Sequence, residues 1–183
     1  MCGISGFIDY NKRTDREMLL KMNRTMAHRG PDGEGYAIFN EEKATVGLGH
    51  RRLSIIDLSE GGAQTKTFQQ LHITFNGEIY NYAEIKAELE AKGHQFNSHS
   101  DTEVILHAYQ AWGSAALQKF IGMFAFAIYD EANQKIFACR DRAGTKPFFY
   151  YWKNGLFLFA SELKAIVEHP AFVKEINIDA VAA

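Results

Sequence analysis

Apolar and polar residues alternate in several short runs along the first half of the chain, which is the pattern of half-buried β-strands. The runs cover residues 3–9, 36–39, 44–50 and 71–75. The last run is expected to end at Asn76-Gly77, because this dipeptide is common in turns and glycine relieves the restriction on φ. The glycines of the first run indicate that another backbone or a ligand lies close to it.

Helical spacing of apolar residues separates these runs. Thr14-Asp15 is expected to begin a helix whose apolar stripe is formed by Met18, Leu19, Met22 and Met26. Such a methionine stripe is typical of a packed core. Further helices are predicted from 81 to 92, from 101 to 113 and from 115 to 120.

The second half of the chain is rich in strand signals. Two hairpins are expected, one joining 123–129 to 135–139 and the other joining 148–152 to 156–159. Asn154-Gly155 in the second connection is the strongest short hairpin signal. Because these strands are almost continuously apolar, both faces of each sheet are expected to be covered. The order of elements therefore predicts an α+β fold, a four-layer αββα sandwich of two mostly antiparallel sheets, in a single domain over residues 1–183.

Composition and charge narrow the range of functions. The 183 residues are 46% hydrophobic and 23% charged, as in an ordinary soluble domain, and the net charge of -2 argues against nucleic acid or an anionic membrane as partner. No apolar run approaches the roughly 20 residues that span a bilayer, and no secretory signal is recognisable, so a cytoplasmic location is expected. Cys2 and Cys139 are expected to stay reduced, and no Cys/His spacing indicates a metal site.

Cys2 is the first candidate for chemistry, since it directly follows the initiator methionine. Its small side chain permits removal of Met1. The freed α-amine, with a reference pKa of about 7.7–8.0, can then act as general base for the thiol of the same residue. This arrangement predicts an N-terminal nucleophile. The alternative is a small buried residue at the start of a strand.

Polar positions near strand ends have both a chemical and a structural interpretation. The guanidinium of Arg52 can hold a substrate carboxylate or form a surface salt bridge. The side-chain amide of Asn76 and the backbone N–H of Gly77 can form an oxyanion hole or belong to a turn. Asp101 can pair with a substrate ammonium or cap a helix. The run 140–142 (RDR) is expected to be a buried ion-pair corner or an interface.

Seven motifs, in this order, resemble the glutaminase domain of asparagine synthetases, a class II glutamine amidotransferase of the N-terminal-nucleophile hydrolase fold. They are residues 1–6 (MCGISG), 27–33 (AHRGPDG), 50–57 (HRRLSIID), 75–81 (FNGEIYN), 100–103 (SDTE), 122–127 (GMFAFA) and 140–142 (RDR). The resemblance covers essentially the whole chain. Related amidotransferases that make glucosamine phosphate or phosphoribosylamine carry different residues around two of these motifs, so the asparagine-synthetase type is indicated.

The resemblance implies a role for each candidate residue. Cys2 would be the nucleophile with its own α-amine as base, and Asn76-Gly77 would stabilise the tetrahedral oxyanion. Arg52 would hold the α-carboxylate of L-glutamine, and Asp101, with Glu78 nearby, its α-ammonium. The same pocket would be lined by backbone groups of Leu53, Ser54, Ile55 and Ile56. The reaction would pass through a γ-glutamyl thioester to glutamate and ammonia.

The resemblance also implies what lies outside this chain. No metal or organic cofactor is required for the glutamine half-reaction. ATP and Mg are expected only for a synthetase domain, whose Ser-Gly-Gly-x-Asp-Ser phosphate loop does not occur in these residues. We therefore expect an excised domain or a stand-alone glutaminase that passes ammonia to a synthetase domain or to a separate ammonia-accepting protein. A homodimer is left open.

Two other functions fit the same sequence. The ammonia could serve another acceptor, such as a carboxyl group on a surface-polysaccharide sugar. Alternatively, the domain could be a non-catalytic binding or regulatory module, which the complete set of Cys2, Arg52, Asn76 and Asp101 argues against. The chain departs from residues usual in the family at Thr65, His99, Ala143 and Thr145.

Overall fold

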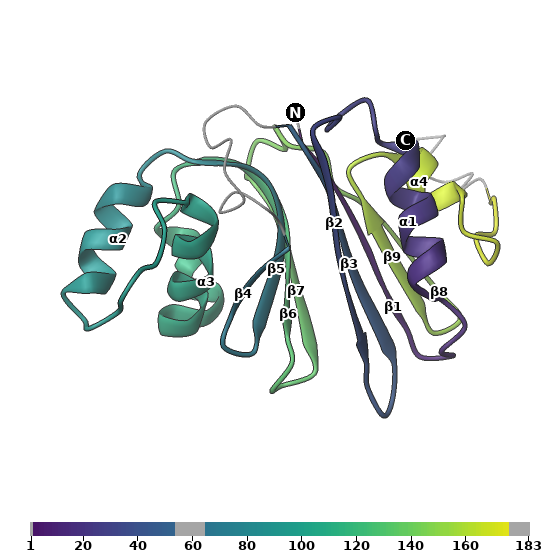
Figure 1. The fold of residues 1–183 in the computed structure, drawn as a ribbon, viewed down its shortest axis with the longest axis horizontal. Helices are drawn as coiled ribbons and strands as arrows, with labels where there is room; N and C mark the ends of the chain where they lie inside the picture. The colour runs from purple at the N-terminus through teal and green to yellow at the C-terminus, as the bar shows by residue number, and fades with distance from the viewer. Residues whose placement is uncertain (1, 54–64, 176–183) are drawn as a thin grey trace.

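The computed structural model describes residues 2–53 and 65–175, and its elements form four layers (Figure 1). Two antiparallel sheets face each other in the centre. Helices α2 (Tyr82–Glu90) and α3 (Asp101–Trp112) cover the outer face of one sheet, and α1 (Arg16–Thr25) and α4 (Leu163–Val167) cover the other. The predicted four-layer αββα sandwich is therefore confirmed. Within the described ranges, no helix is both long and apolar enough to cross a bilayer.

The first sheet has five strands in the order β2-β3-β1-β9-β8. These strands are β1 (Gly3–Asp9), β2 (Gly33–Asn40), β3 (Thr45–Arg52), β8 (Phe149–Lys153) and β9 (Leu156–Ala160). Alternate residues of β1 face opposite sides, and Phe7 packs beneath α1 against Leu19 and Met22. The α1 helix begins where it is predicted to begin, because the side chain of Asp15 accepts the backbone N–H of Met18 at 2.9 Å.

The second sheet has four strands in the order β4-β5-β6-β7. These strands are β4 (Lys66–Phe68), β5 (Leu71–Ile79), β6 (Gly122–Asp130) and β7 (Lys135–Arg140), and a short 3-10 helix, η2 (Gly113–Gln118), follows α3. The side chains of Ile73 and Phe75 on β5 pack outward against Val104 and Ile105 of α3. Neighbouring residues of β5 therefore face inward, toward the first sheet.

A separate hydrophobic core fills the space between the two sheets. Its buried members are Val46, Leu48, Ala127, Tyr129 and Phe159. They come from β3 and β9 of the first sheet and from β6 of the second. This core stops before the ends of β3 and β5, where polar residues replace apolar ones on the same inward faces.

One prediction about the second sheet needs correction, and two short elements were missed. The strand expected to end before Asn76-Gly77 continues to Ile79, with Asn76 paired to Ala125 and Gly77 to Phe124. The turn interpretation of this dipeptide is therefore wrong. The short elements β4 and α4 were not predicted, because three and five residues carry too little periodicity to be recognised.

Candidate active site

Cys2 lies directly before β1, and its side chain is half-buried. Leu53, the residue after the end of β3, brackets the sulfur: its backbone N–H points to Sγ at 3.5 Å, and its carbonyl oxygen lies 3.9 Å from Sγ. The strand register explains this contact, since Gly3 pairs with Arg51 and the antiparallel alignment continues beyond them. Cys2 and Cys139 are both free thiols.

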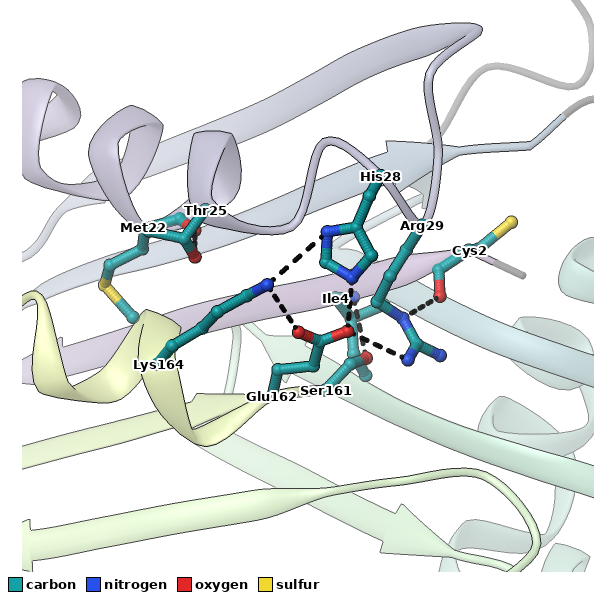
Figure 2. A network of polar contacts seen from close by, with 9 residues as sticks. All are labelled: Cys2, Ile4, Met22, Thr25, His28, Arg29, Ser161, Glu162 and Lys164. Atoms are coloured by element: carbon teal, nitrogen blue, oxygen red, sulfur yellow. Dashed lines mark hydrogen bonds and ion pairs between the residues drawn. The ribbon is translucent and has the colours of Figure 1, made fainter.

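A guanidinium fixes the backbone of Cys2 (Figure 2). Arg29 donates from Nε to the carbonyl oxygen of Cys2 at 3.0 Å and from Nη1 to Glu162 at 3.2 Å. The sulfur points away from this network in Figure 2, so the contact orients the residue without covering the thiol. Glu162 also contacts His28 and Lys164, each at 2.9 Å. Burial alone would raise the pKa of the Glu162 carboxyl, but hydrogen bonds from Lys164, Arg29 and His28 outweigh it and hold the pKa below its usual value.

The turn that carries Arg29 is pressed against the end of β3. Gly30 permits this approach, because a Cβ there would lie 2.4 Å from the carbonyl carbon of Arg51. Arg51 donates from Nε to the carbonyl oxygen of Gly30 at 3.1 Å, and the backbone N–H of Asp32 donates to the carbonyl oxygen of Arg52 at 3.0 Å. Arg29 is a site residue that the sequence pattern did not single out. The only available signal was an arginine inside a run of helix breakers.

Arg52 ends β3 on the face that looks toward the second sheet. Side chains two positions apart on a strand share a face, and Leu48 of the same strand belongs to the core between the sheets. Gly6 pairs with Leu48, so Cys2, an even number of residues before Gly6, continues the same face of β1. Cys2 and Arg52 therefore project from one face at one end of the sheet. Three residues expected to line the pocket lie outside the described residues: Ser54, Ile55 and Ile56.

Asn76 lies inside the β5–β6 ladder and is only 2% exposed. Thr74 on the same strand faces the first sheet, since its hydroxyl donates to the carbonyl oxygen of Gly49 at 2.9 Å, and Asn76 faces the same way. Nδ2 of Asn76 is buried and has no hydrogen-bond partner in the part of the chain that the structure describes. An unpaired buried donor costs on the order of 1–3 kcal/mol. The amide is therefore available to an acceptor that a ligand would bring.

Only glycine fits at position 77. A Cβ on Gly77 would lie 2.2 Å from the carbonyl oxygen of Met123 on β6. The facing segment of β6 is itself fixed, because the buried carboxylate of Asp141 accepts the backbone N–H of Phe124 at 3.2 Å and that of Lys146 at 3.0 Å. Residues 140–142 were expected to form a buried ion-pair corner or an interface. Backbone hydrogen bonds to Asp141 organise this segment.

Asp101 is the first residue of α3, and its Oδ2 accepts the backbone N–H of Ile79, at the end of β5, at 3.1 Å. The helix cap is Ser100, whose hydroxyl accepts the backbone N–H of Thr102 at 3.2 Å, so the interpretation of Asp101 as the cap is wrong. Burial raises the pKa of Asp101, and the charge of the exposed Glu78 adds to this effect, against the hydrogen bond from Ile79. These surroundings favour the arrival of a cation.

The described residues thus bring the two halves of the predicted site to one end of the space between the sheets. Cys2 and Arg52 come from the first sheet, and Asn76 and Gly77 come from the second. Asp101 is tied by its hydrogen bond to the end of the strand that carries Asn76. No group of three or more His, Cys, Asp or Glu side chains that could hold a metal occurs within residues 2–53 and 65–175.

Comparisons with known proteins show the family to which the chain belongs. A family model described as a glutamine amidotransferase domain matches residues 1–183. The chain is 42% identical to asparagine synthetase (glutamine-hydrolyzing) 3 of Bacillus subtilis over 93% of its own length. It is 39% identical to asparagine synthetase B (glutamine-hydrolyzing) of Escherichia coli over 96% of its length. It spans 28% and 31%, respectively, of these two relatives.

A solved structure shares the fold. The glutamine phosphoribosylpyrophosphate amidotransferase of B. subtilis superposes with a TM-score of 0.74 at 21% identity, over 91% of this chain and 43% of that chain. This likeness concerns the fold alone. It bears out the predicted four-layer αββα sandwich of two mostly antiparallel sheets.

Proposed function

The chain belongs to the glutamine amidotransferase domain family, in the form found in glutamine-hydrolysing asparagine synthetases, and from this premise we propose that it hydrolyses L-glutamine to glutamate and ammonia. The observation that carries the proposal is the buried, unpartnered Nδ2 of Asn76 on the face opposite Cys2. A buried donor that is kept without a partner, on a face turned toward the sheet that carries a nucleophile, can stabilise charge that develops in a transition state.

Cys2 acts as the nucleophile once Met1 is removed. Its α-amine takes the proton from its thiol, and the thiolate attacks the side-chain carbonyl carbon of glutamine, so that a C–S bond forms. The tetrahedral intermediate collapses as the C–N bond breaks, and the α-ammonium returns a proton to the leaving ammonia. Water then attacks the γ-glutamyl thioester, releases glutamate and restores the thiol. Glutamine and water are thereby converted into glutamate and ammonia.

The oxyanion of each tetrahedral intermediate is held by two donors on β5. One is Nδ2 of Asn76, and the other is the backbone N–H of Gly77. The unpaired state of Nδ2 and the close packing that fixes Gly77 against Met123 support these roles. Because both donors belong to a rigid strand, they need little reorganisation when charge develops, and one such donor is worth about 10²–10³ in kcat.

The charged end of glutamine is recognised by residues around this centre. Arg52 holds the α-carboxylate, while Asp101, assisted by Glu78, holds the α-ammonium. The raised pKa of Asp101 supports this role, because a bound cation relieves the cost of keeping this half-buried carboxylate ionised. Each charge-assisted contact contributes about 1.5–3 kcal/mol. Leu53 lines the pocket beside Cys2, and by family resemblance Ser54, Ile55 and Ile56 continue this lining.

The ammonia passes to a synthetase domain that uses ATP and Mg to activate a carboxylate, as in the asparagine synthetases that the chain resembles. The relatives are about three times longer than this chain, which leaves room in them for such a domain. No residue described here chooses the acceptor, so a sugar carboxyl group is the second candidate. The glutamine half-reaction itself uses no metal or organic cofactor.

Glutamate release from L-glutamine by Met1-free protein tests the proposal. Cys2→Ala should abolish release while leaving the fold intact. Cys139→Ala is the matched control, because burial raises the pKa of that thiol to about 11 and Cys139 lies on β7, away from the site. Intact mass must first establish that the protein begins at Cys2. Release that survives Cys2→Ala would refute the nucleophile, and a folded, Met1-free wild type without release would favour a non-catalytic module.

A further inference from the structure

His50 is a buried histidine that the proposed reaction leaves without a role. It lies on β3, on the same face as Leu48 and Arg52, and its side chain is 1% exposed. Its partner across the ladder is Ile4 of β1. The imidazole therefore occupies the space between the sheets, at the point where the apolar core gives way to the residues of the site.

Among the residues that the structure describes, the ring makes one hydrogen bond, and that bond crosses to the other sheet. Nε2 of His50 lies 3.1 Å from the carbonyl oxygen of Phe75 on β5, which faces β3 across the sandwich (Figure 1). Because a carbonyl only accepts, Nε2 must carry the proton. Burial lowers the pKa of His50 to about 4, and the charges of Arg52 and Arg51 act in the same direction, although the hydrogen bond to Phe75 opposes them. The ring is therefore neutral near pH 7.

This bond reaches the peptide group that precedes the oxyanion donors. The carbonyl of Phe75 and the N–H of Asn76 belong to one planar peptide unit. Rotation of that unit would turn the backbone of Asn76 and, with it, the direction of its side-chain amide. The histidine thus connects β3, which ends at Arg52, to the part of β5 on which the two donors are placed.

Stability alone does not account for a histidine at this position. Nδ1 is buried and has no hydrogen-bond partner among residues 2–53 and 65–175. An unsatisfied buried polar atom costs on the order of 1–3 kcal/mol, whereas an apolar side chain of similar volume would fill the same space without that cost. The compensating gain therefore comes from the hydrogen bond that Nε2 makes to the carbonyl oxygen of Phe75.

We propose that His50 is a positioning residue, which sets the Phe75–Asn76 peptide and thereby aims Asn76 at the oxyanion formed on Cys2-bound substrate. The inference rests on the proposed glutaminase function. It predicts a loss in kcat with little change in KM, because the residues that hold the charged end of glutamine are not displaced. A misplacement of catalytic groups by about 1 Å can cost on the order of 100-fold.

Thr74 provides a matched control. Its hydroxyl also makes a hydrogen bond between the same two strands, to the carbonyl oxygen of Gly49, but this bond does not involve the peptide that leads into Asn76. Thr74→Val should therefore weaken the contact between the sheets about as much as a substitution of His50. It should leave kcat within about threefold of wild type, well short of what misplaced catalytic groups cost.

The test measures kcat, KM and thermal stability of Met1-free variants at position 50. His50→Leu cannot donate, and His50→Asn is too short to reach the carbonyl oxygen of Phe75 on β5. Both variants should therefore lose about 10- to 100-fold in kcat with KM within about twofold. His50→Gln places an amide N–H near the position of Nε2 and should recover most of the loss. If His50→Leu does not fold, the Asn and Gln pair still decides the matter.

Several outcomes would overturn the inference while leaving the proposed function intact. They are a folded His50→Leu with wild-type kcat, a His50→Gln as slow as His50→Asn, or a Thr74→Val as slow as His50→Leu. A wild type that releases no glutamate would instead remove the proposed function. In that case ¹⁵N NMR of the ring still tests the geometry: the Nε2–H tautomer should persist from neutral pH down to about 5, and titration within that range would contradict it.

Discussion

Two carboxylates beside the site have opposite electrostatic surroundings. Glu162 lies behind Cys2 among Arg29, His28 and Lys164, which hold its pKa below the usual value. Asp101 lies at the end of β5, where burial raises its pKa and Glu78 adds to the shift. The charge of Glu162 is matched within the chain, whereas the surroundings of Asp101 favour its neutral form. A carboxylate with cationic partners in the chain supports the structure, whereas a carboxylate without enough of them indicates where a ligand brings the positive charge.

Two hydrogen-bonding groups of the site, the backbone carbonyl of Cys2 and the side-chain amide of Asn76, show the same contrast. The carbonyl oxygen of Cys2 is held by Arg29, while Nδ2 of Asn76 has no partner in the described ranges. If the contrast is correct, substitution of a group that has no partner within the described residues should reduce activity without reducing stability. Substitution of a group whose charge or hydrogen bond is satisfied within the chain should reduce stability first.

The largest effect is expected for Asn76→Ala. Loss of one oxyanion donor should lower kcat for glutamine hydrolysis by about 10²–10³-fold. The free energy of unfolding should stay unchanged or rise, because the variant removes a buried donor that has no partner. Steady-state kinetics and urea unfolding on the same preparation measure both quantities. A large loss of stability with unchanged kcat would show that the amide is structural.

An intermediate effect is expected for Asp101→Asn, which keeps an acceptor for the backbone N–H of Ile79. KM for glutamine should rise about tenfold or more, because a charge-assisted contact to the α-ammonium is lost. Burial raises the pKa of Asp101, and the hydrogen bonds from Ile79 and Thr102 and the charge of Lys66 offset this only in part. The stability that comes from the neutral carboxyl is therefore present at acid pH and lost as pH rises through the folded pKa. The variant should therefore match or exceed wild-type stability at neutral pH, with a difference that shrinks on acidification. An unchanged KM would place Asp101 outside the pocket.

The smallest effect is expected for Glu162→Gln. Its lowered pKa means that the carboxylate stabilises the fold above its usual pKa of 4.5, and that this contribution disappears as pH falls through the lower folded value. We expect a loss of about 1 kcal/mol at neutral pH, because the group is partly exposed and such pairs are weak. Urea unfolding at neutral pH and at about pH 3 checks the sign, since the variant and wild type should converge in acid. A difference that grows in acid would contradict the assignment.

Two Asn-Gly dipeptides show how much of the fold the sequence could predict. Asn154-Gly155 forms the expected hairpin turn, and both residues have positive φ, 50° and 74°. Asn76-Gly77 instead lies inside a strand. Glycine is required there because a Cβ would meet the carbonyl oxygen of Met123, on a strand distant in sequence. Elements with local causes, such as β1 and α1, were therefore predictable from pattern. The strand position of Gly77 could not be predicted in this way, because a neighbouring strand determines the residue type there.

The candidate site divides in the same way. Cys2, Arg52, Asn76 and Asp101 could be named because their chemistry suits glutamine and their order resembles that of a family. Arg29 and His50 could not be given roles, since each acts on a backbone carbonyl of another segment. Which carbonyl lies within reach is decided by the packing of the two sheets, and no local spacing contains that information.

The most direct test of the central claim is to trap the covalent intermediate. Met1-free protein is mixed with L-glutamine, quenched in acid within the first turnovers, digested and examined by mass spectrometry. We predict a glutamyl group on the peptide that begins at Cys2, present in Cys139→Ala and removed by hydroxylamine, as a thioester should be. Sustained glutamate release with no glutamyl group on that peptide, or with the group on another residue, would contradict the account.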